Sequence, residues 1–453
     1  MRRQTHTAAH DVSTAAADDV AVRTSETLRV AVISMLFPSP SETFISARMR
    51  TLTELGASVR VHALRTPHPN AGELVEQRRL NTIPTRHNSV SRSLAGVLHA
   101  LRRPQLVGMV LRHAVLPSWR KPRQLLRAVL YMPRAFDILA DLEEDPPDVL
   151  HLAWGHYPSI VGMLVQRVLP SVSTSVNLIA YDLAMEFAGT LTVSRRADVV
   201  RTQAEVNVPH IARFTGVPPD RIAVIYDGVD VKTIEAVAGE IVRVPGRIVT
   251  AGRLIAEKGM EDALRAFARV ANEVDHATFR VLGEGPLRPK LERLATSLGV
   301  ADRVRFLGHV PHEGVIREMA AAESFLFLSR SERLPNVVKE AMACGSIPIT
   351  TRTEGIEELV EDGVTGFLVD HDAIHDAARI AIAVANGRMD SELVRANART
   401  HVERSFDHDD NVGRLFGMWV ACVRTRKESM TVGSPGNAPI RVPDRNGTTA
   451  AGR

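Results

Sequence analysis

The chain of 453 residues contains only two cysteines and few aromatic residues, and it has no apolar run long enough to cross a bilayer. Cys344 and Cys422 do not have the spacing of a metal site and imply no disulfide framework, which is typical of a reducing compartment. Residues 1–20 also lack the apolar segment of a signal peptide. We therefore expect a cytoplasmic protein.

Acidic residues are absent from residues 78–134, which contain eleven Arg and one Lys. The whole chain is nearly balanced, so its total charge gives no reason to expect a nucleic-acid partner. Basic helices with an apolar face can lie on an anionic membrane surface, which predicts peripheral attachment. Ordinary domain helices with a solvated basic face are the alternative. Prolines are expected to divide the stretch into short helices: Pro104, Pro117, Pro122 and Pro133.

Apolar runs of strand length alternate with helical patterns along most of the chain, which predicts two parallel, doubly wound α/β domains. We expect the first domain at residues 28–240 and the second at 241–407, joined near 228–245. The expected strands of the first are 28–34, 58–64, 148–153, 174–179, 198–202 and 222–226. Those of the second are 246–251, 277–282, 303–307, 324–328 and 346–350, with helices starting near Gly259, Pro286, His312 and Pro335.

The two ends of the chain differ from this pattern. Residues 1–27 and 428–453 are rich in small and polar residues without an apolar period, which predicts disordered tails. Residues 408–427 instead carry apolar side chains at helical spacing. We expect this last helix to dock on another part of the protein.

Glu332 and Glu340 flank a predicted helix start in the segment ERLPNVVKEAMACG. Pro335 suits the first helical turn, and free backbone N–H groups near Asn336, Val337 and Val338 would attract a phosphate. Two carboxylates beside a phosphate site can accept hydrogen bonds from hydroxyl groups on either side of the phosphate. A diphosphate between two polyols is a nucleotide sugar.

Two further segments follow strands of the same predicted sheet. Arg253 and Lys258 lie in GRLIAEKG, where two cations could neutralise a leaving diphosphate without a metal. Gly283 and Gly285 bracket a turn in VLGEGP and would let the backbone approach a base or a phosphate. Taken singly, the GRLIAEKG segment could be a solvated loop, VLGEGP a tight turn, and the segment with the two glutamates a solvated helix start. All three segments, however, are predicted at the same edge of one sheet.

These motifs, together with EGIEELVEDGVTGFLV, resemble the retaining nucleotide-sugar glycosyltransferases of family four, which have the GT-B fold. The resemblance covers about residues 28–427 and is most specific over 246–370. It implies two Rossmann-like domains facing each other across a cleft, with the last helix returning to the first domain. It also implies that UDP- or GDP-linked donors are bound without a further cofactor or metal. The donor-side residues implied by the resemblance are Arg253, Lys258, Glu332, Leu334, Pro335, Asn336, Val337 and Glu340.

In that scheme Arg253 and Lys258 hold the diphosphate, Glu340 meets the ribose hydroxyls and Glu332 faces the transferred sugar. The segment FPSPSETFI resembles the first loop of members that build surface polysaccharides. The expected acceptor side comprises Ser41, Glu42, His156, Tyr181 and Asp182.

One segment departs from the family pattern. Ile179 and Ala180 precede Tyr181 and Asp182, where many members carry a His-Gly pair. In those members the histidine lies near the donor sugar, so its absence here affects either a donor contact or the activity itself. We predict a retaining glycosyltransferase that acts on a cell-surface polysaccharide or lipid-linked glycan. A nucleotide-sugar epimerase and a non-catalytic nucleotide-sugar-binding subunit are the alternatives.

Overall fold

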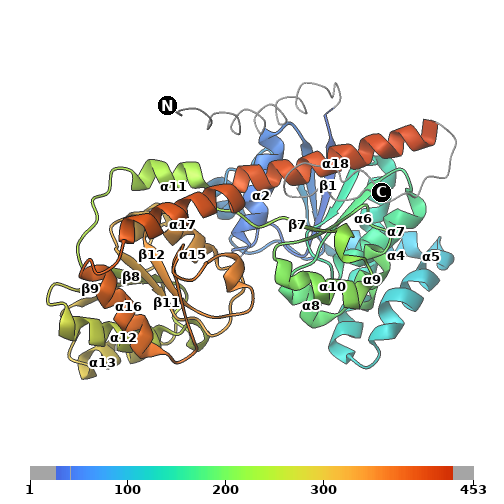
Figure 1. Cartoon of the computed structure of the whole chain (residues 1–453). Helices are drawn as coiled ribbons and strands as arrows, with labels where there is room; N and C mark the ends of the chain where they lie inside the picture. Colours follow the sequence, from blue (N-terminus) through green and yellow to red (C-terminus); the bar gives the residue numbers. More distant parts are fainter. Residues whose placement is uncertain (1–26, 41, 432–453) are drawn as a thin grey trace, which may run out of the picture. The chain divides into compact units, whose positions relative to one another are not determined.

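The computed structural model describes residues 27–40 and 42–431, and the predicted tails lie almost entirely outside this range. The chain divides into two compact units (Figure 1). The first unit includes residues up to Gln203, then Asn207–Ile225 and the part of the last helix that starts at Val412. The second unit contains Ala204–Val206 and Tyr226–Asn411. The division therefore falls before the expected boundary at residue 240.

The expected linker near 228–245 contains a helix, α11 (Val231–Ala238), which belongs to the second unit. Asp230 caps this helix, because its carboxylate accepts a hydrogen bond of 2.9 Å from the backbone N–H of Thr233. An aspartate at this position satisfies a backbone donor that the helix leaves free. The segment is thus an ordered element rather than a simple connection.

The first unit is built on a parallel sheet of seven strands in the order β3-β2-β1-β4-β5-β6-β7. Its central strands are continuous apolar runs because helices cover both faces of a parallel sheet. Strand β3 is a two-residue edge strand that the sequence analysis did not predict. The strands are β1 (Arg29–Ser34), β2 (Ser58–Ala63), β3 (Thr85–Arg86), β4 (Val149–Leu152), β5 (Ser173–Asn177), β6 (Val199–Thr202) and β7 (Ile222–Val224).

Helix α6 (Pro122–Glu144) is longer than the sequence analysis expected, because Pro133 lies inside it and does not end it. Pro104 and Pro122 do begin helices, as their fixed φ favours. A π-helical segment and a 3-10 turn occupy Leu111–Val115 and Leu116–Ser118. The other helices of this unit are α2 (Thr43–Glu54), α3 (Ala71–Gln77), α4 (Val90–Leu101), α5 (Pro104–Val110), α7 (Pro158–Val168), α8 (Ala180–Met185), α9 (Ala188–Ser194) and α10 (Val208–Thr215).

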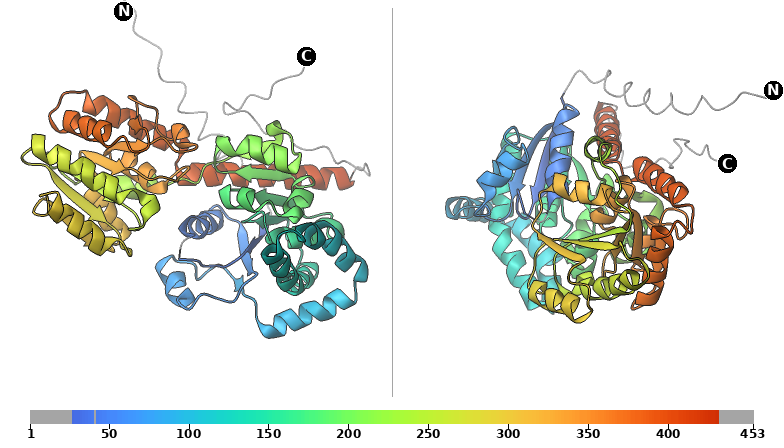
Figure 2. Two further views of the ribbon diagram at one scale, coloured as in Figure 1. Left: turned by 90° about the horizontal axis from the view of Figure 1, so that it is seen from below. Right: turned by 90° about the vertical axis from the view of Figure 1, so that its left-hand side faces the viewer.

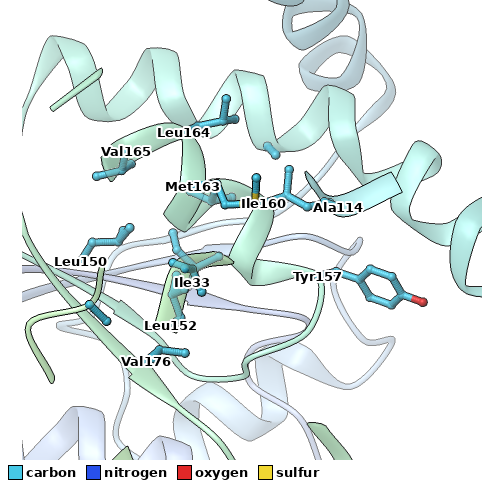
Figure 3. Close-up of a cluster of buried hydrophobic side chains, with 14 of the residues drawn as sticks. Ile33, Ala114, Leu150, Leu152, Tyr157, Ile160, Met163, Leu164, Val165 and Val176 are labelled. Carbon is cyan, nitrogen blue, oxygen red and sulfur yellow. The ribbon is translucent and has the colours of Figure 1, made fainter. Parts of the chain in front are cut away.

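The core of the first unit lies between the sheet and its helices (Figure 3). Ile33, Leu150 and Val176 come from three neighbouring strands and are fully buried. Ile160 and Leu164 of α7 pack against the same cluster. Burying each such side chain contributes about 1.5–3 kcal/mol relative to an exposed position. These contacts fix the strand ends that carry polar residues.

Helix α18 (His408–Thr431) supplies the apolar face that the sequence predicts. Val412, Leu415, Trp419 and Cys422 are buried in one cluster with residues of β1, β2 and α2. Arg426 also forms an ion pair with Asp198. The greater part of the last helix is therefore integrated into the first unit.

The second unit contains a parallel sheet of six strands in the order β10-β9-β8-β11-β12-β13. Strand β13 adds an edge that the sequence analysis did not list among its strands. The strands are β8 (Arg247–Ala251), β9 (Thr278–Leu282), β10 (Val304–Gly308), β11 (Ser324–Phe327), β12 (Ile347–Thr351) and β13 (Phe367–Val369). The helices are α12 (Met260–Glu273), α13 (Arg288–Ser297), α14 (His312–Ala320), α15 (Asn336–Ala343), α16 (Ile374–Ala385) and α17 (Ser391–Ser405). Both units are thus Rossmann-like, which confirms the expected fold class.

Candidate functional site

The start of helix α15 lies beyond the carboxyl end of β11, where open α/β sheets bind ligands. The helix begins at Asn336, and Pro335 stands just before it rather than in its first turn. Glu332 lies in the preceding loop and Glu340 one turn inside the helix. The N–H of Val338 is not free as expected, because it donates to the carbonyl of Pro335 at 3.1 Å.

Lys339 fixes this helix start from the inside. Its side chain is buried, and Nζ donates to the carbonyl of Asp227 at 2.6 Å and to Oδ1 of Asn336 at 3.0 Å. A buried ammonium group requires such acceptors, because the charge is otherwise strongly destabilised. Asn336 is therefore an acceptor for Lys339. Sequence reasoning missed this lysine, although it lies inside the quoted motif.

Lys258 and Glu332 form an ion pair at this edge. Lys258 ends a 3-10 turn after β8, and its ammonium group also lies 5.7 Å from the centre of the Phe327 ring. The two charged side chains are only 19% and 24% exposed, so water screens the pair incompletely. Arg253 lies in the same loop with an exposed side chain. An anion at this position would compete with Glu332 for Lys258.

Glu340 is held by a histidine that the sequence analysis noted only as a helix start. Nε2 of His312 lies 3.0 Å from Oε1 of Glu340. The hydrogen bond to Glu340 raises the pKa of His312 above its ordinary value of 6.5. His312 begins α14 and follows the carboxyl end of β10, and this placement was a signal that the sequence already contained. The carboxylate assigned to ribose hydroxyls thus already has a hydrogen-bonding partner.

The glycine turn after β9 approaches the neighbouring loop very closely. A Cβ atom at Gly283 would lie 2.0 Å from the carbonyl oxygen of Gly252, and Gly283 has a φ of +122°. A Cβ atom at Gly285 would lie 2.5 Å from the carbonyl oxygen of Leu254. Both glycines are therefore needed for packing against the loop that carries Arg253. Their approach to a base or phosphate stays a prediction.

A second polar cluster lies at the carboxyl ends of β4 and β5 in the first unit. The carboxylate of Asp182 is fully buried. Its Oδ1 accepts hydrogen bonds from the backbone N–H of His156 at 3.0 Å and from Nδ1 of His156 at 2.7 Å. Oδ2 accepts one from the backbone N–H of Ile179 at 3.2 Å. Asp182 thereby fixes the imidazole of His156 and the loop that carries Ile179.

Aromatic rings surround His156. The ring of Tyr181 stands at 5.3 Å and that of Trp154 at 5.6 Å, both edge to face. Tyr181 is 51% exposed, so one ring of this group is open to solvent. Burial raises the pKa of Glu42 above its ordinary value, and Trp154, His156 and Arg65 oppose this rise only in part. Four of the five expected acceptor-side residues therefore belong to one unit, and Ser41 lies outside the described residues.

The structure shows no group of three or more His, Cys, Asp or Glu side chains placed to hold a metal ion within residues 27–40 and 42–431. The donor-side residues all belong to the second unit, and the acceptor-side residues to the first. The expected meeting of these two groups across a cleft stays a prediction. None of the described helices is both long and apolar enough to cross a membrane.

Comparison with known proteins defines the class to which the second unit belongs. Residues 238–401 match the model of the family described as glycosyl transferases group 1, and all of them lie in the second unit. The matched residues contain Lys258, Glu332, Glu340 and the glycine turn. The family resemblance inferred from the sequence motifs is thereby confirmed.

Curated relatives include several bacterial glycosyltransferases. The D-inositol 3-phosphate glycosyltransferase of Acidothermus cellulolyticus is 30% identical over 54% of this chain and 57% of its own length. The putative colanic acid biosynthesis glycosyltransferase WcaL of Salmonella typhimurium is 31% identical over 42% of this chain and 49% of its own. The chain therefore spans about half the length of the curated relatives it matches.

Solved structures extend the similarity over most of the chain. Anabaena Alr3699/HepE in complex with UDP has a TM-score of 0.61 and 16% identity, covering 90% of this chain and all of that one. The lipopolysaccharide outer core galactosyltransferase WaaB has a TM-score of 0.61 and 15% identity, covering 87% and 99%. At this identity the likeness concerns the fold alone, which is GT-B.

Proposed function

We propose that this protein is a retaining, metal-independent glycosyltransferase that uses a nucleotide diphosphate sugar. The single observation that carries the proposal is the partly buried pair of Lys258 and Glu332 beside the start of α15. It combines a cation for phosphate and an acceptor for sugar hydroxyls in one place. Both residues lie in the part of the chain that matches the glycosyl transferases group 1 model.

The proposed donor complex exchanges the partners of both glutamates. The diphosphate replaces Glu332 as the partner of Lys258 and lies near Arg253 and the α15 start. Glu332 is then free to accept a hydroxyl of the transferred sugar. Glu340 accepts the ribose hydroxyls and gives up part of its contact with His312. Because the diphosphate and the hydroxyl groups replace the partners that are lost, each charged side chain keeps a hydrogen-bonding partner in the complex.

The proposed reaction forms the new glycosidic bond on the face from which the nucleotide leaves. The acceptor hydroxyl oxygen attacks the anomeric carbon while the bond from that carbon to the diphosphate oxygen breaks. The departing phosphate oxygen takes the proton of the acceptor hydroxyl, so no protein nucleophile is needed. Lys258 and Arg253 stabilise the negative charge that develops on the diphosphate.

The proposed acceptor is a cell-surface polysaccharide or a lipid-linked glycan, and no nucleic acid takes part. Several matched relatives carry names of polysaccharide assembly, including the amylovoran biosynthesis glycosyltransferase AmsK of Erwinia amylovora. The group formed by Trp154, His156 and Tyr181 supports this choice, because aromatic rings and polar groups together suit a sugar ring. We place the reaction in the cytoplasm, at the inner face of the membrane.

A donor screen tests the proposal. UDP- and GDP-sugars are first ranked by thermal shift, since a bound ligand raises the melting temperature by mass action. The best donor is then incubated with a membrane lipid extract, and the released nucleotide diphosphate and the configuration of the product are measured. We expect release that depends on the acceptor and retention at the anomeric carbon. An inverted product would contradict the retaining mechanism.

The absence of a histidine at Ile179 favours keeping one alternative, a non-catalytic nucleotide-sugar-binding subunit. That alternative predicts binding of donor without release of nucleotide under any acceptor condition. An epimerase predicts a changed sugar with donor alone. The same screen separates all three functions.

A further inference from the structure

Exposed apolar side chains are concentrated in one part of the first unit. Among the described residues, seventeen large apolar side chains are exposed, and ten of them lie within residues 90–130. Single exposed apolar residues are common on protein surfaces, but a concentration of them marks an interaction surface. We call these ten the apolar surface: Val90, Leu94, Val97, Leu98, Leu101, Leu116, Trp119, Leu126, Val129 and Leu130.

Helix α4 supplies half of this surface because its opposite face is already occupied. A Cβ atom at Gly96 would lie 1.8 Å from the carbonyl oxygen of Pro133, so α4 packs very closely on α6 through this glycine. Arg103 at its end forms an ion pair of 2.7 Å with Glu143 of α6. Leu94 and Leu98, spaced four residues apart, are 62% and 57% exposed. Figure 2 (left) shows the light-blue helices of this region at the lower edge of the first unit.

The other five residues of the apolar surface lie in the segment after α5 and in the first turns of α6. Trp119 is 66% exposed, and the guanidinium group of Arg120 lies 4.9 Å from its ring centre. Leu126 and Leu130 of α6 are 67% and 66% exposed. Exposed tryptophan beside leucine is typical of the interface between lipid headgroups and acyl chains.

The charge around the apolar surface is positive. Several cations of residues 78–134 are not available to bind a partner. Arg86 and Arg92 pair with Asp141, and the Arg134 side chain is fully buried beside Asp137. Between residues 90 and 130 of the described chain, five exposed arginines have no carboxylate partner. Arg127 hydrogen-bonds to Tyr157, and the other four are Arg102, Arg112, Arg120 and Arg123. Each such cation adds to the attraction toward an anionic membrane surface.

We propose that the apolar surface and these four arginines form the membrane-docking surface of the protein, with an anionic lipid bilayer as the partner. Apolar side chains enter the interface while the arginines bind lipid phosphates. The proposal deepens the proposed function, because a lipid-linked acceptor would lie in the same bilayer. It also restricts the membrane contact, which the sequence analysis assigned to residues 78–134 as a whole, to α4, the segment around Trp119 and the start of α6.

Vesicle flotation without donor or acceptor tests the proposal. The full chain is mixed with vesicles of phosphatidylcholine alone or with phosphatidylglycerol added, at low and high salt. We expect binding to the anionic vesicles that decreases at high salt. An apolar variant (Leu94→Gln, Leu98→Gln, Trp119→Ser, Leu126→Gln) should bind at least about tenfold more weakly, since lipid affinity scales with buried apolar area. The charge variant R112Q/R120Q/R123Q should lose the preference for anionic lipid.

Exposed leucines of the second unit provide the matched control. Leu393 is 57% exposed, as Leu98 is, and Leu393→Gln should bind vesicles like the unchanged protein. Circular dichroism and melting temperature verify that each variant is folded. Absence of binding to anionic vesicles at low salt would overturn the proposal. Dimerisation of the unchanged chain that the apolar variant abolishes, without any vesicle binding, would assign the surface to a second copy instead.

This experiment is independent of catalysis. Donor binding, measured by thermal shift on the same preparations, reports on the proposed donor site and not on the apolar surface. A protein that floats with vesicles but binds no nucleotide sugar would contradict the proposed function and leave the docking surface intact. One that binds donor but never floats would contradict the docking surface only.

Discussion

The carboxyl edges of the two sheets differ in how their charges are held. In the second unit Glu332 and Glu340 pair with Lys258 and His312 in partly exposed contacts. In the first unit Asp182 is fully buried and accepts three hydrogen bonds from its own surroundings. Partly exposed pairs exchange their partners at little cost, whereas a buried, fully bonded carboxylate does not. The second edge thus suits a charged ligand, and the first suits a fixed shape.

The largest effect should come from removing the phosphate cation of the second edge. We expect Lys258→Ala to lower the transfer rate about 10²–10³-fold, because one electrostatic contact to a developing anion contributes about that much. Steady-state kinetics with the donor found in the screen measures it. Lys290→Ala is the control, since Lys290 pairs with Glu261 on an exposed surface. Equal rates for the two variants would remove Lys258 from the catalytic site.

The buried carboxylate of the first edge should matter mainly for stability. We expect Asp182→Ala to lower the free energy of unfolding by about 3 kcal/mol, because it leaves buried donors without an acceptor. Denaturant unfolding measures this change. Asp182→Asn keeps the shape of the side chain and one of its two acceptor oxygens, so the decrease in unfolding free energy should be smaller. If Asp182→Ala unfolds like the unchanged protein, the first edge is as adaptable as the second.

The second edge should separate nucleotide binding from transfer. We expect Glu340→Ala to weaken binding of the nucleotide diphosphate about tenfold, the loss of one or two hydrogen bonds to a charged acceptor. Glu332→Ala should instead slow transfer and leave nucleotide affinity within a factor of about two. Isothermal titration calorimetry and kinetics measure the two quantities. Glu313→Ala serves as control, because Glu313 lies in α14 and is exposed. Unchanged affinity in the Glu340 variant contradicts the ribose role.

The sequence predicted the sheets and the donor-side residues because both depend on local pattern. Apolar runs of strand length identify buried parallel strands, and the residues that follow them lie at the ligand-binding edge. Glu332 and Lys258 could be placed there although 74 residues separate them. Short edge strands such as β3 lack that apolar signal and were missed.

Features that depend on tertiary contacts could not be predicted. Pro133 lies inside α6, where its carbonyl oxygen packs against Gly96 of α4, and this contact cannot be read from the local sequence. The exposure of Leu94 and Leu98 could not be decided from their helical spacing, because that spacing suits both a buried face and a membrane-facing one, and the sequence analysis left both open. The partner of Glu340 was missed for the same reason, since His312 is 28 residues away.

The smallest effect concerns the pH dependence of stability at the second edge. His312 has a raised pKa because of its hydrogen bond to Glu340, so the folded state binds its proton more tightly than the unfolded chain. The resulting stability is complete below the ordinary pKa of 6.5 and is lost as the pH rises through the raised value. His312 is 59% exposed, so we expect only about 0.5 kcal/mol.

Unfolding free energies of the unchanged protein and of His312→Ala, measured from about pH 5 to pH 9, should therefore differ at the acidic end and converge at the alkaline end. His309→Ala, at an exposed position three residues earlier, should run parallel to the unchanged protein. A saturating nucleotide diphosphate should shrink the acidic difference, because its ribose takes over the carboxylate of Glu340. A difference that persists with nucleotide bound would mean that Glu340 keeps its histidine, and the exchange of partners that distinguishes the second edge from the first would not occur there.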